Sequence, residues 1–195
     1  MYQLPFTFTL PTPYPVPSQY NAHLVRRLSD LGGYFLDQHD YDAMLAQDNP
    51  VLYEVYEIDR PLEIGELLMG VSIVHPGKVG NEFFMTKGHF HAVLDTAEVY
   101  LVLQGEGCMV MENPEGECAV EWLNPGQVLY VPPRWAHRSV CIGRHVPLIT
   151  FFIYPAHSGH DYGSIEQTGF RKLVVEREGN IVVIDNPKYN RSDDA

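Results

Sequence analysis

The chain has 195 residues, of which 45% are hydrophobic, and a formal net charge of -12 at pH 7. This length suits one domain with a packed core, because folding at this size buries roughly 70% of the surface of the unfolded chain. The negative charge argues against nonspecific nucleic-acid binding, which needs a basic surface to displace counterions from phosphates. An anionic small substrate is not excluded, since Lys87, Arg134, His160 or a bound metal could oppose the global field locally.

Membrane insertion and secretion are not indicated either. No apolar stretch approaches the ~18 residues that cross a bilayer, and the first residues lack the basic start and apolar middle of a secretion signal. Cys108, Cys118 and Cys141 are odd in number and show no Cys-x-x-Cys spacing. This pattern argues against a disulfide framework and fits a reducing compartment. We therefore expect a soluble, cytoplasmic protein without a membrane partner.

The amino-terminal part of the chain predicts little regular structure. Residues 1–20 contain five prolines, a composition that favours extended backbone, so we expect an N-terminal arm followed by a single domain over residues 21–195. Residues 21–37 favour no particular element. The segment 40–47 has an acidic start and good helix formers, and Asn49-Pro50 ends it, which predicts a helix. A second short helix is expected at 164–167.

From residue 51 onward the sequence is typical of β-structure. Short runs rich in Val, Ile, Tyr or Phe are bounded by Gly, Pro, Asn or Asp. Several runs are apolar throughout, which suits strands covered on both faces, as in a small barrel or two packed sheets. The segments 113–116 and 178–180 indicate hairpin turns. The predicted strands are 51–58, 67–74, 82–91, 98–105, 108–113, 127–132, 137–142, 148–155, 172–177 and 180–185.

Four side chains form a candidate divalent-metal site. His89 and His91 are two residues apart on a predicted strand, so they project to the same face, with Phe90 on the other. Glu98 opens the next predicted strand, which a short turn would fold back beside the first. His137 follows about forty residues later. Three imidazoles and one carboxylate suit iron, manganese, nickel or zinc better than calcium or magnesium.

The histidine pair alone does not establish a site. A single histidine on a strand is usually a surface residue or a hydrogen-bonded core residue, and nine histidines in one chain produce some pairs by chance. The prediction depends on the combination of the pair with Glu98, with the glycine turn at 105–107, and with His137 after Gly126 and Pro132.

The two histidine segments resemble the cupin superfamily, whose small β-barrels hold a metal through His-x-His and a nearby Glu from a first motif and one His from a second. Three features depart from that pattern. Six residues separate His91 from Glu98, Arg134 stands where Gly is common, and Cys141 stands where Asn is usual. None removes a ligand. The resemblance therefore implies an all-β, cupin-type β-barrel (jelly roll) with a few short helices and the extended arm.

More narrowly, the chain is similar to the cupin-type glucose-6-phosphate isomerases. The resemblance implies a homodimer that interconverts glucose 6-phosphate and fructose 6-phosphate, a step of glycolysis and gluconeogenesis. It also implies one divalent ion per subunit, with iron first and manganese, nickel or zinc as alternatives. The matching strings, spread from Arg26 to Tyr189, are RRLSDLGGYF, VLYEVY, HPGKVGNEFFMTKGHFHAVLDTAEVY, YVPPRWAHR, IYPAHSGHDYG and DNPKY.

The same resemblance maps the substrate contacts. Phosphate contacts fall on Thr86, Gly88, Tyr154, His160 and Tyr162, with Ser72 and Tyr100 facing the pocket. Hydroxyl and backbone donors satisfy phosphate oxygens, and a protonated His160 would add charge. Tyr154 and Tyr162 could equally be core residues, which is the commoner fate of tyrosine in a β-barrel.

The chemistry leaves several alternatives open. Isomerisation moves a hydrogen between C2 and C1 of the sugar, and an ion with two positions left by its four protein ligands would stabilise the enediolate. Glu98 is the candidate base for a cis-enediol(ate) route, and a hydride shift is the competing mechanism. Two other functions fit the same ligands: a cupin iron dioxygenase that activates O2, and a noncatalytic sugar-binding cupin.

Overall fold

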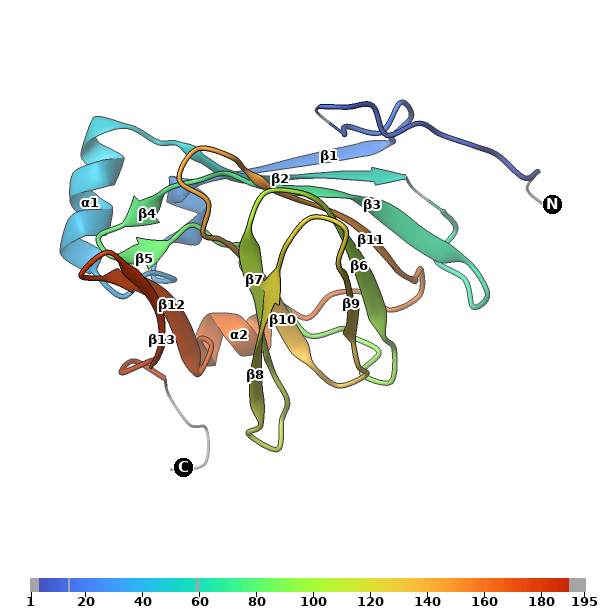
Figure 1. Cartoon of the computed structure of the whole chain (residues 1–195). Coiled ribbons are helices and arrows are strands. Elements are labelled where there is room, and N and C mark those ends of the chain that lie inside the picture. The colour runs from blue at the N-terminus through green and yellow to red at the C-terminus, as the bar shows by residue number, and fades with distance from the viewer. Residues whose placement is uncertain (1–3, 14, 59, 190–195) are drawn as a thin grey trace.

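Antiparallel strands form most of the regular secondary structure of the protein (Figure 1). The computed structural model describes residues 4–13, 15–58 and 60–189. Neither α-helix in these ranges has the length and apolar character that crossing a bilayer requires. In chain order the elements are β1 (Ala22–Arg27), the 3-10 helix η1 (Leu28–Leu31), α1 (Gln38–Gln47), β2 (Val51–Ile58), β3 (Leu67–Val74), β4 (Lys78–Val79), β5 (Glu82–Phe83), β6 (Glu98–Gln104), β7 (Gly107–Glu112), β8 (Cys118–Leu123), β9 (Val128–Val131), β10 (Ala136–Cys141), β11 (Leu148–Pro155), α2 (Gly163–Thr168), β12 (Lys172–Arg177) and β13 (Asn180–Asp185).

The strands form three sheets. A six-stranded sheet has the order β1-β2-β3-β11-β6-β9, a three-stranded sheet the order β10-β7-β8, and a four-stranded sheet the order β13-β12-β5-β4. One continuous buried cluster joins Val74 and Val102 of the six-stranded sheet to Met109 and Val140 of the three-stranded sheet. These two sheets therefore pack face to face and form the barrel, which confirms the predicted all-β class.

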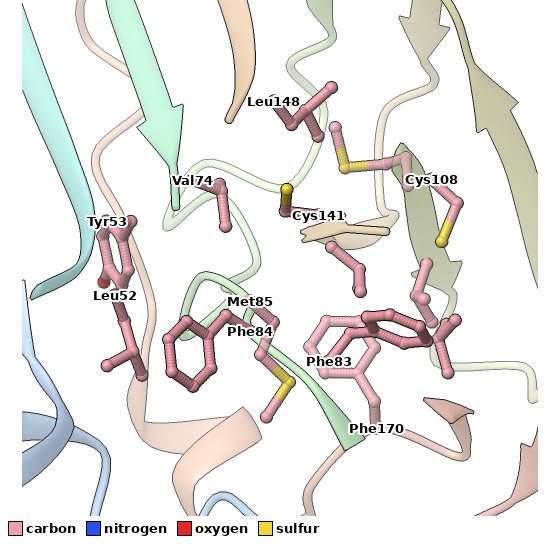
Figure 2. Close-up of a cluster of buried hydrophobic side chains, with 14 of the residues drawn as sticks. Leu52, Tyr53, Val74, Phe83, Phe84, Met85, Cys108, Cys141, Leu148 and Phe170 are labelled. Atoms are coloured by element: carbon pink, nitrogen blue, oxygen red, sulfur yellow. The ribbon is translucent and has the colours of Figure 1, made fainter. Parts of the chain in front are cut away.

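One end of the barrel is filled by apolar side chains. Figure 2 shows Val74 and Leu148 of the six-stranded sheet gathered with Cys108 and Cys141 of the opposite sheet, above the ring of Phe170. Phe170 is completely buried, and burying a side chain of this size stabilises the fold by about 1.5–3 kcal/mol. This packed end fixes the distance between the two sheets, so the other end can stay hollow.

The amino-terminal arm covers the outer face of the six-stranded sheet. Leu10 and Val16 pack against a second buried cluster made by Val71, Ile73 and Ile149, and they have no regular secondary structure. In Figure 1 the arm is the dark blue trace beside β1. Residues 4–13 and 15–20 contain no helix or strand, as expected, but they fold back on themselves, since the amide of Ser18 donates to the carbonyl of Thr9 at 2.9 Å. Residues 1–3 and 14 of the predicted arm lie outside the described residues.

Both predicted helices and both predicted hairpin turns are confirmed. Helix α1 begins at Gln38, two residues before the predicted start, because the side chain of Asp37 caps it by accepting a hydrogen bond from the amide of Asp40 at 2.9 Å. Helix α2 extends the predicted 164–167 segment by one residue at each end. The turns contain Gly116 and Gly179, whose φ angles of 95° and 78° are those that glycine adopts easily.

The segment 82–91 differs from its prediction as one continuous strand. Only β5 is regular, and beyond it the backbone makes isolated bridges at Met85, His89 and Phe90. Gly88 interrupts the extended backbone with a φ of 75°. The expectation that the strand of Glu98 folds back beside this segment is wrong, because β6 pairs with β11 and β9. Residues 92–97 instead carry the chain from one wall of the barrel to the other.

Candidate metal centre and substrate cavity

The two histidines of the GHFH segment face the barrel interior together, as predicted. The ring centroids of His89 and His91 lie 5.9 Å apart. A small antiparallel pair adds the third imidazole: the amide of His137 donates to the carbonyl of His89 at 3.1 Å, and the amide of His89 donates back at 3.3 Å. The rings of His89 and His137 are consequently 4.6 Å apart.

Glu98 completes the group from the opposite sheet. Its Oε2 lies 3.1 Å from Nε2 of His91 and 3.0 Å from Nε2 of His137, and the carboxylate is 2% exposed. One ligand atom from each of the four residues lies within 4.8 Å of all the others. The sequence-predicted set His89, His91, Glu98 and His137 is thus brought together around one point.

The nitrogen atoms that face this point show that the group fits a cation. Among the described residues, Nε2 of His89 and Nε2 of His137 are buried without a hydrogen-bond partner, so the short approach of His137 to Glu98 lacks hydrogen-bond angles. Buried polar atoms are normally paired. Two unpaired imidazole nitrogens and a buried carboxylate therefore form a donor set that a divalent transition metal would satisfy.

The outer nitrogen of His91 fixes its tautomer. Nδ1 lies 2.8 Å from the Thr96 hydroxyl and 3.1 Å from the Thr96 carbonyl. The hydroxyl already donates its hydrogen to the carbonyl of Val93 at 2.6 Å, so it accepts from His91. His91 thus donates a proton from Nδ1 to Thr96, and with an ion bound Nε2 would present its lone pair to that ion in place of its present 3.1 Å contact with Glu98. Such outer contacts orient a ring before the metal arrives.

Burial and mutual charge set the protonation of the group. Burial alone would raise the pKa of Glu98, but His137 and His91 beside it lower that pKa below its ordinary value, so the carboxylate is ionised. Burial lowers the pKa of His89 well below its usual range and that of His160 to about 4. At neutral pH His160 is therefore an uncharged hydrogen-bonding group in the free protein.

A cavity of about 400 Å³ opens from this group toward the wall built by β1 and β2. His89, Glu98 and His137 belong to its lining. Volumes in this range are typical of small-molecule sites. The cavity also contains every residue that the sequence predicted as a substrate contact: Ser72, Thr86, Gly88, Tyr100, Tyr154, His160 and Tyr162.

The tyrosines of the cavity keep their hydroxyl protons. Burial raises the pKa of Tyr100 and of Tyr154 above the ordinary value, and it raises the pKa of Tyr162 to about 12. The Tyr154 hydroxyl donates to Glu57 at 3.4 Å. At neutral pH the three hydroxyls are donors, which suits the oxygens of a sugar or a phosphate.

Sequence reasoning missed part of the cavity wall. Tyr53, Val55 and Glu57 line it from β2, and Ala22 and Leu24 line it from β1. The signal for the first three was present, because residues two apart on a strand share a face. The β1 residues could not be assigned, since the sequence of 21–37 favoured no element.

Two basic residues expected near the substrate do not line the cavity. Lys87 points away from the cavity, and its Nζ lies 3.2 Å from a carboxylate oxygen of Glu166. Arg134 pairs with Glu115 at 3.1 Å on the surface. Neither side chain is placed to oppose the negative field inside the cavity.

Gly88 stands where no other residue fits. Its φ is 75°, and a Cβ built on it would lie 2.5 Å from the ring of Phe170 and 3.0 Å from Cβ of Arg138. The left-handed backbone disfavours other L residues, and the ring cannot move because it is buried. This glycine sets the path of the backbone that leads into His89.

We expect Gly88→Ala to destabilise the protein by about 1–3 kcal/mol more than Gly179→Ala. Gly179 has a similar φ of 78° but open space around its Cβ position, so the difference isolates the clash with Phe170. Thermal or denaturant unfolding of the two variants measures it. Equal losses would show that the ring of Phe170 does not constrain the segment.

Fold and site together define a cupin-type β-barrel with a candidate three-histidine, one-glutamate metal centre that opens into a polar cavity. The family model described as glucose-6-phosphate isomerase matches residues 25–191. The chain belongs to this glucose-6-phosphate isomerase family.

Three relatives named as isomerases are similar to this chain over most of its length. A glucose-6-phosphate isomerase of Thermococcus kodakarensis is 53% identical over 168 residues, which cover 85% of this chain and 87% of that protein. The one from Pyrococcus furiosus is 49% identical over 167 residues, covering 86% and 88%. A putative glucose-6-phosphate isomerase 1 of Rhizobium meliloti is 40% identical over 173 residues, covering 87% and 80%. Among solved structures, oxalate decarboxylase from Bacillus subtilis at pH 4.6 aligns with 55% of this chain and 26% of that chain, at 22% identity and a TM-score of 0.44.

Proposed function

We propose that this protein interconverts glucose 6-phosphate and fructose 6-phosphate in the cavity, with one divalent ion per subunit held by His89, His91, Glu98 and His137. The observation that carries the proposal is that the predicted substrate contacts and three of the four predicted ligands line one cavity of about 400 Å³. Relatives of similar length named glucose-6-phosphate isomerase support the choice of substrate.

Residues near the metal ligands act on the reacting carbons of the sugar, and residues around Gly88 bind its phosphate. A divalent ion, when bound, supplies positive charge that stabilises the oxygens of the reacting carbons. Glu98 takes the proton from C2 or C1 and returns it to the neighbouring carbon, through a cis-enediol(ate). When the sugar binds, Tyr100 and Tyr154 turn their hydroxyl hydrogens from Glu98 and Glu57 to sugar oxygens. Their hydroxyls are protonated at neutral pH because burial raises their pKa.

The phosphate end is built by donors around Gly88. The Thr86 hydroxyl oxygen accepts a hydrogen bond from the amide of Ser139 at 3.1 Å, so its own hydrogen remains available for a phosphate oxygen. The amide of Gly88 and the hydroxyl of Tyr162 supply further donors. Neutral donors of this kind bind phosphate oxygens and also fix the direction of the sugar chain.

The choice of ion and the assembly extend the proposal. The donor set accepts iron, manganese, nickel or zinc, and we infer iron as the native ion. We also infer a homodimer in the cytoplasm that serves glycolysis and gluconeogenesis. Metal analysis of the protein as isolated from its own cells tests the first inference, and light scattering tests the second.

One assay tests the proposed reaction. The protein is stripped by a chelator, re-supplied with Fe(II), Mn(II), Ni(II) or Zn(II) separately, and given fructose 6-phosphate while glucose 6-phosphate is detected through a coupled dehydrogenase. An oxygen electrode records the same samples. We expect isomerisation that requires an added ion and consumes no oxygen.

Each other result favours a different function. Oxygen consumption without isomerisation would assign the site to a dioxygenase. Tight sugar-phosphate binding without turnover under any ion would assign it to a noncatalytic sugar-binding protein. Full turnover in the stripped protein would contradict the metal requirement while leaving the isomerase activity in place.

A further inference from the structure

The cavity is negatively charged, and so is the phosphate of its proposed substrate. Its described lining residues include the carboxylates of Glu57 and Glu98 but no lysine or arginine. A phosphate monoester brings a further charge of about -1.5 to -2 at pH 7. Glu98 would be neutralised by the ion it helps to bind, but the phosphate lies at the other end. Such a cavity needs a cation near Thr86 and Gly88.

Arg26 continues the inner wall of the barrel toward that end. In the antiparallel pair of β1 and β2, Ala22 lies opposite Glu57, Leu24 opposite Val55, and Arg26 opposite Tyr53. All five of the other residues line the cavity. Since directly opposite residues share a face of the sheet, the Arg26 side chain emerges on the cavity side, next to Tyr53.

The guanidinium of Arg26 has a donor to spare at this place. Its Nε is buried and has no hydrogen-bond partner among the described residues. Burial raises the pKa of Tyr53, and the Lys87 backbone and a side-chain contact with Arg26 oppose that rise. Burial likewise raises the pKa of Tyr162, and the charge of Arg26 opposes it. Arg26 therefore lies close to Tyr53 and Tyr162, which both line the cavity.

The backbone of Lys87 contacts the side chain of Tyr53, and this contact shows where Tyr53 and Arg26 lie in relation to the cavity. Lys87 lies between Thr86 and Gly88, whose polar groups form the proposed phosphate end. The neighbouring Arg27 shows the contrast, because it faces outward and its Nη1 donates to the carbonyl of Asn49 at 2.9 Å. Arg27 is thus engaged in a hydrogen bond at the surface, whereas Arg26 has a buried N–H donor without a partner near the cavity.

We propose that Arg26 is the cationic residue of the phosphate end and supplies, beside Tyr53 and Tyr162, the positive charge that the substrate phosphate requires. This inference rests on the proposed function, because it names the charge partner of that substrate. Arg26 is then a determinant of specificity, since it makes the site favour a phosphorylated sugar over the same sugar without phosphate.

The test compares two ligands that differ only in the phosphate. Wild type, Arg26→Gln, Arg26→Lys and Arg27→Gln, all loaded with the same divalent ion, are titrated calorimetrically with 6-phosphogluconate, and gluconate is measured by displacement. We expect Arg26→Gln to weaken 6-phosphogluconate binding by about 10- to 100-fold and to leave gluconate binding nearly unchanged. Arg27→Gln removes the same charge from the surface and should leave both affinities as in wild type. Arg26→Lys should retain most of the preference.

Several results would overturn the proposal. These are an unchanged preference for 6-phosphogluconate in Arg26→Gln, an equal loss for both acids, or the same loss in Arg27→Gln. If Arg26→Gln does not fold, the lysine variant decides: a folded, metal-loaded Arg26→Lys that has lost the preference would overturn the proposal as well. Failure of wild type to bind either acid would instead contradict the proposed function, so the two failures are distinguishable.

Discussion

His91→Gln is expected to lower kcat/KM for fructose 6-phosphate by at least about 10³-fold, because metal stabilisation of the reacting oxygens contributes several kcal/mol and each 1.36 kcal/mol is tenfold in rate. His91 is the best-held ligand of the group. Its Nδ1 is fixed by Thr96, and its Nε2 lies 3.1 Å from Glu98. Glutamine lacks the imidazole nitrogen, and its neutral amide is a much poorer ligand for a transition metal.

The measurement pairs turnover with metal content in the same sample. His39→Gln is the matched control, because His39 is an exposed histidine on α1; we expect wild-type turnover and one ion per chain from it. We expect His91→Gln to lose metal and turnover together. A variant that retains turnover after losing its metal would show that the ion has no part in the reaction.

Glu98→Gln is expected to lower kcat by about 10²- to 10⁴-fold, the range that a positioned general base supplies. The amide has nearly the shape of the carboxylate but cannot accept the proton from carbon. Because glutamine is also a poorer metal ligand, turnover is measured with excess ion and metal occupancy is determined on the same sample. Full turnover with metal bound would exclude Glu98 as the base.

Solvent isotope incorporation distinguishes the enediol(ate) route from a hydride shift. When the wild-type reaction runs in heavy water, a proton held by Glu98 exchanges with solvent before it returns to carbon. We therefore expect deuterium at C1 or C2 of the product. A product free of deuterium would favour a hydride shift between the two carbons, and Glu98 would then act only as a ligand.

Local patterns predicted the elements of the fold better than their partners. Strands β3 and β11 have the predicted bounds, because their burial on both faces requires a nearly continuous hydrophobic sequence. Strand β1 was missed, since His23, Arg26 and Arg27 interrupt any hydrophobic run in its sequence. Its extended conformation depends on pairing with β2. Strand β8 was missed for a similar reason: it is an edge strand with a largely half-exposed pattern.

In the candidate site too, local features were predicted correctly and long-range pairing was not. The period of two predicted correctly that His89 and His91 share a face, and the family resemblance supplied residues that the structure places in one cavity. The fold-back of Glu98 was wrong because pairing partners depend on the path of residues 92–97, which no local pattern describes. Lys87 was only a candidate charge for the substrate, and its position two residues before His89 could not decide its direction, because the left-handed backbone at Gly88 interrupts the strand alternation.

Location of the bound ion tests the proposed metal centre most directly. Crystals of the protein loaded with manganese would be measured at a wavelength where manganese scatters anomalously. We expect one strong peak per chain, within about 2.0–2.3 Å of an imidazole nitrogen from each of His89, His91 and His137 and of a Glu98 carboxylate oxygen. A fully loaded protein whose peak lies elsewhere, or contacts only part of this set, would contradict the proposed centre.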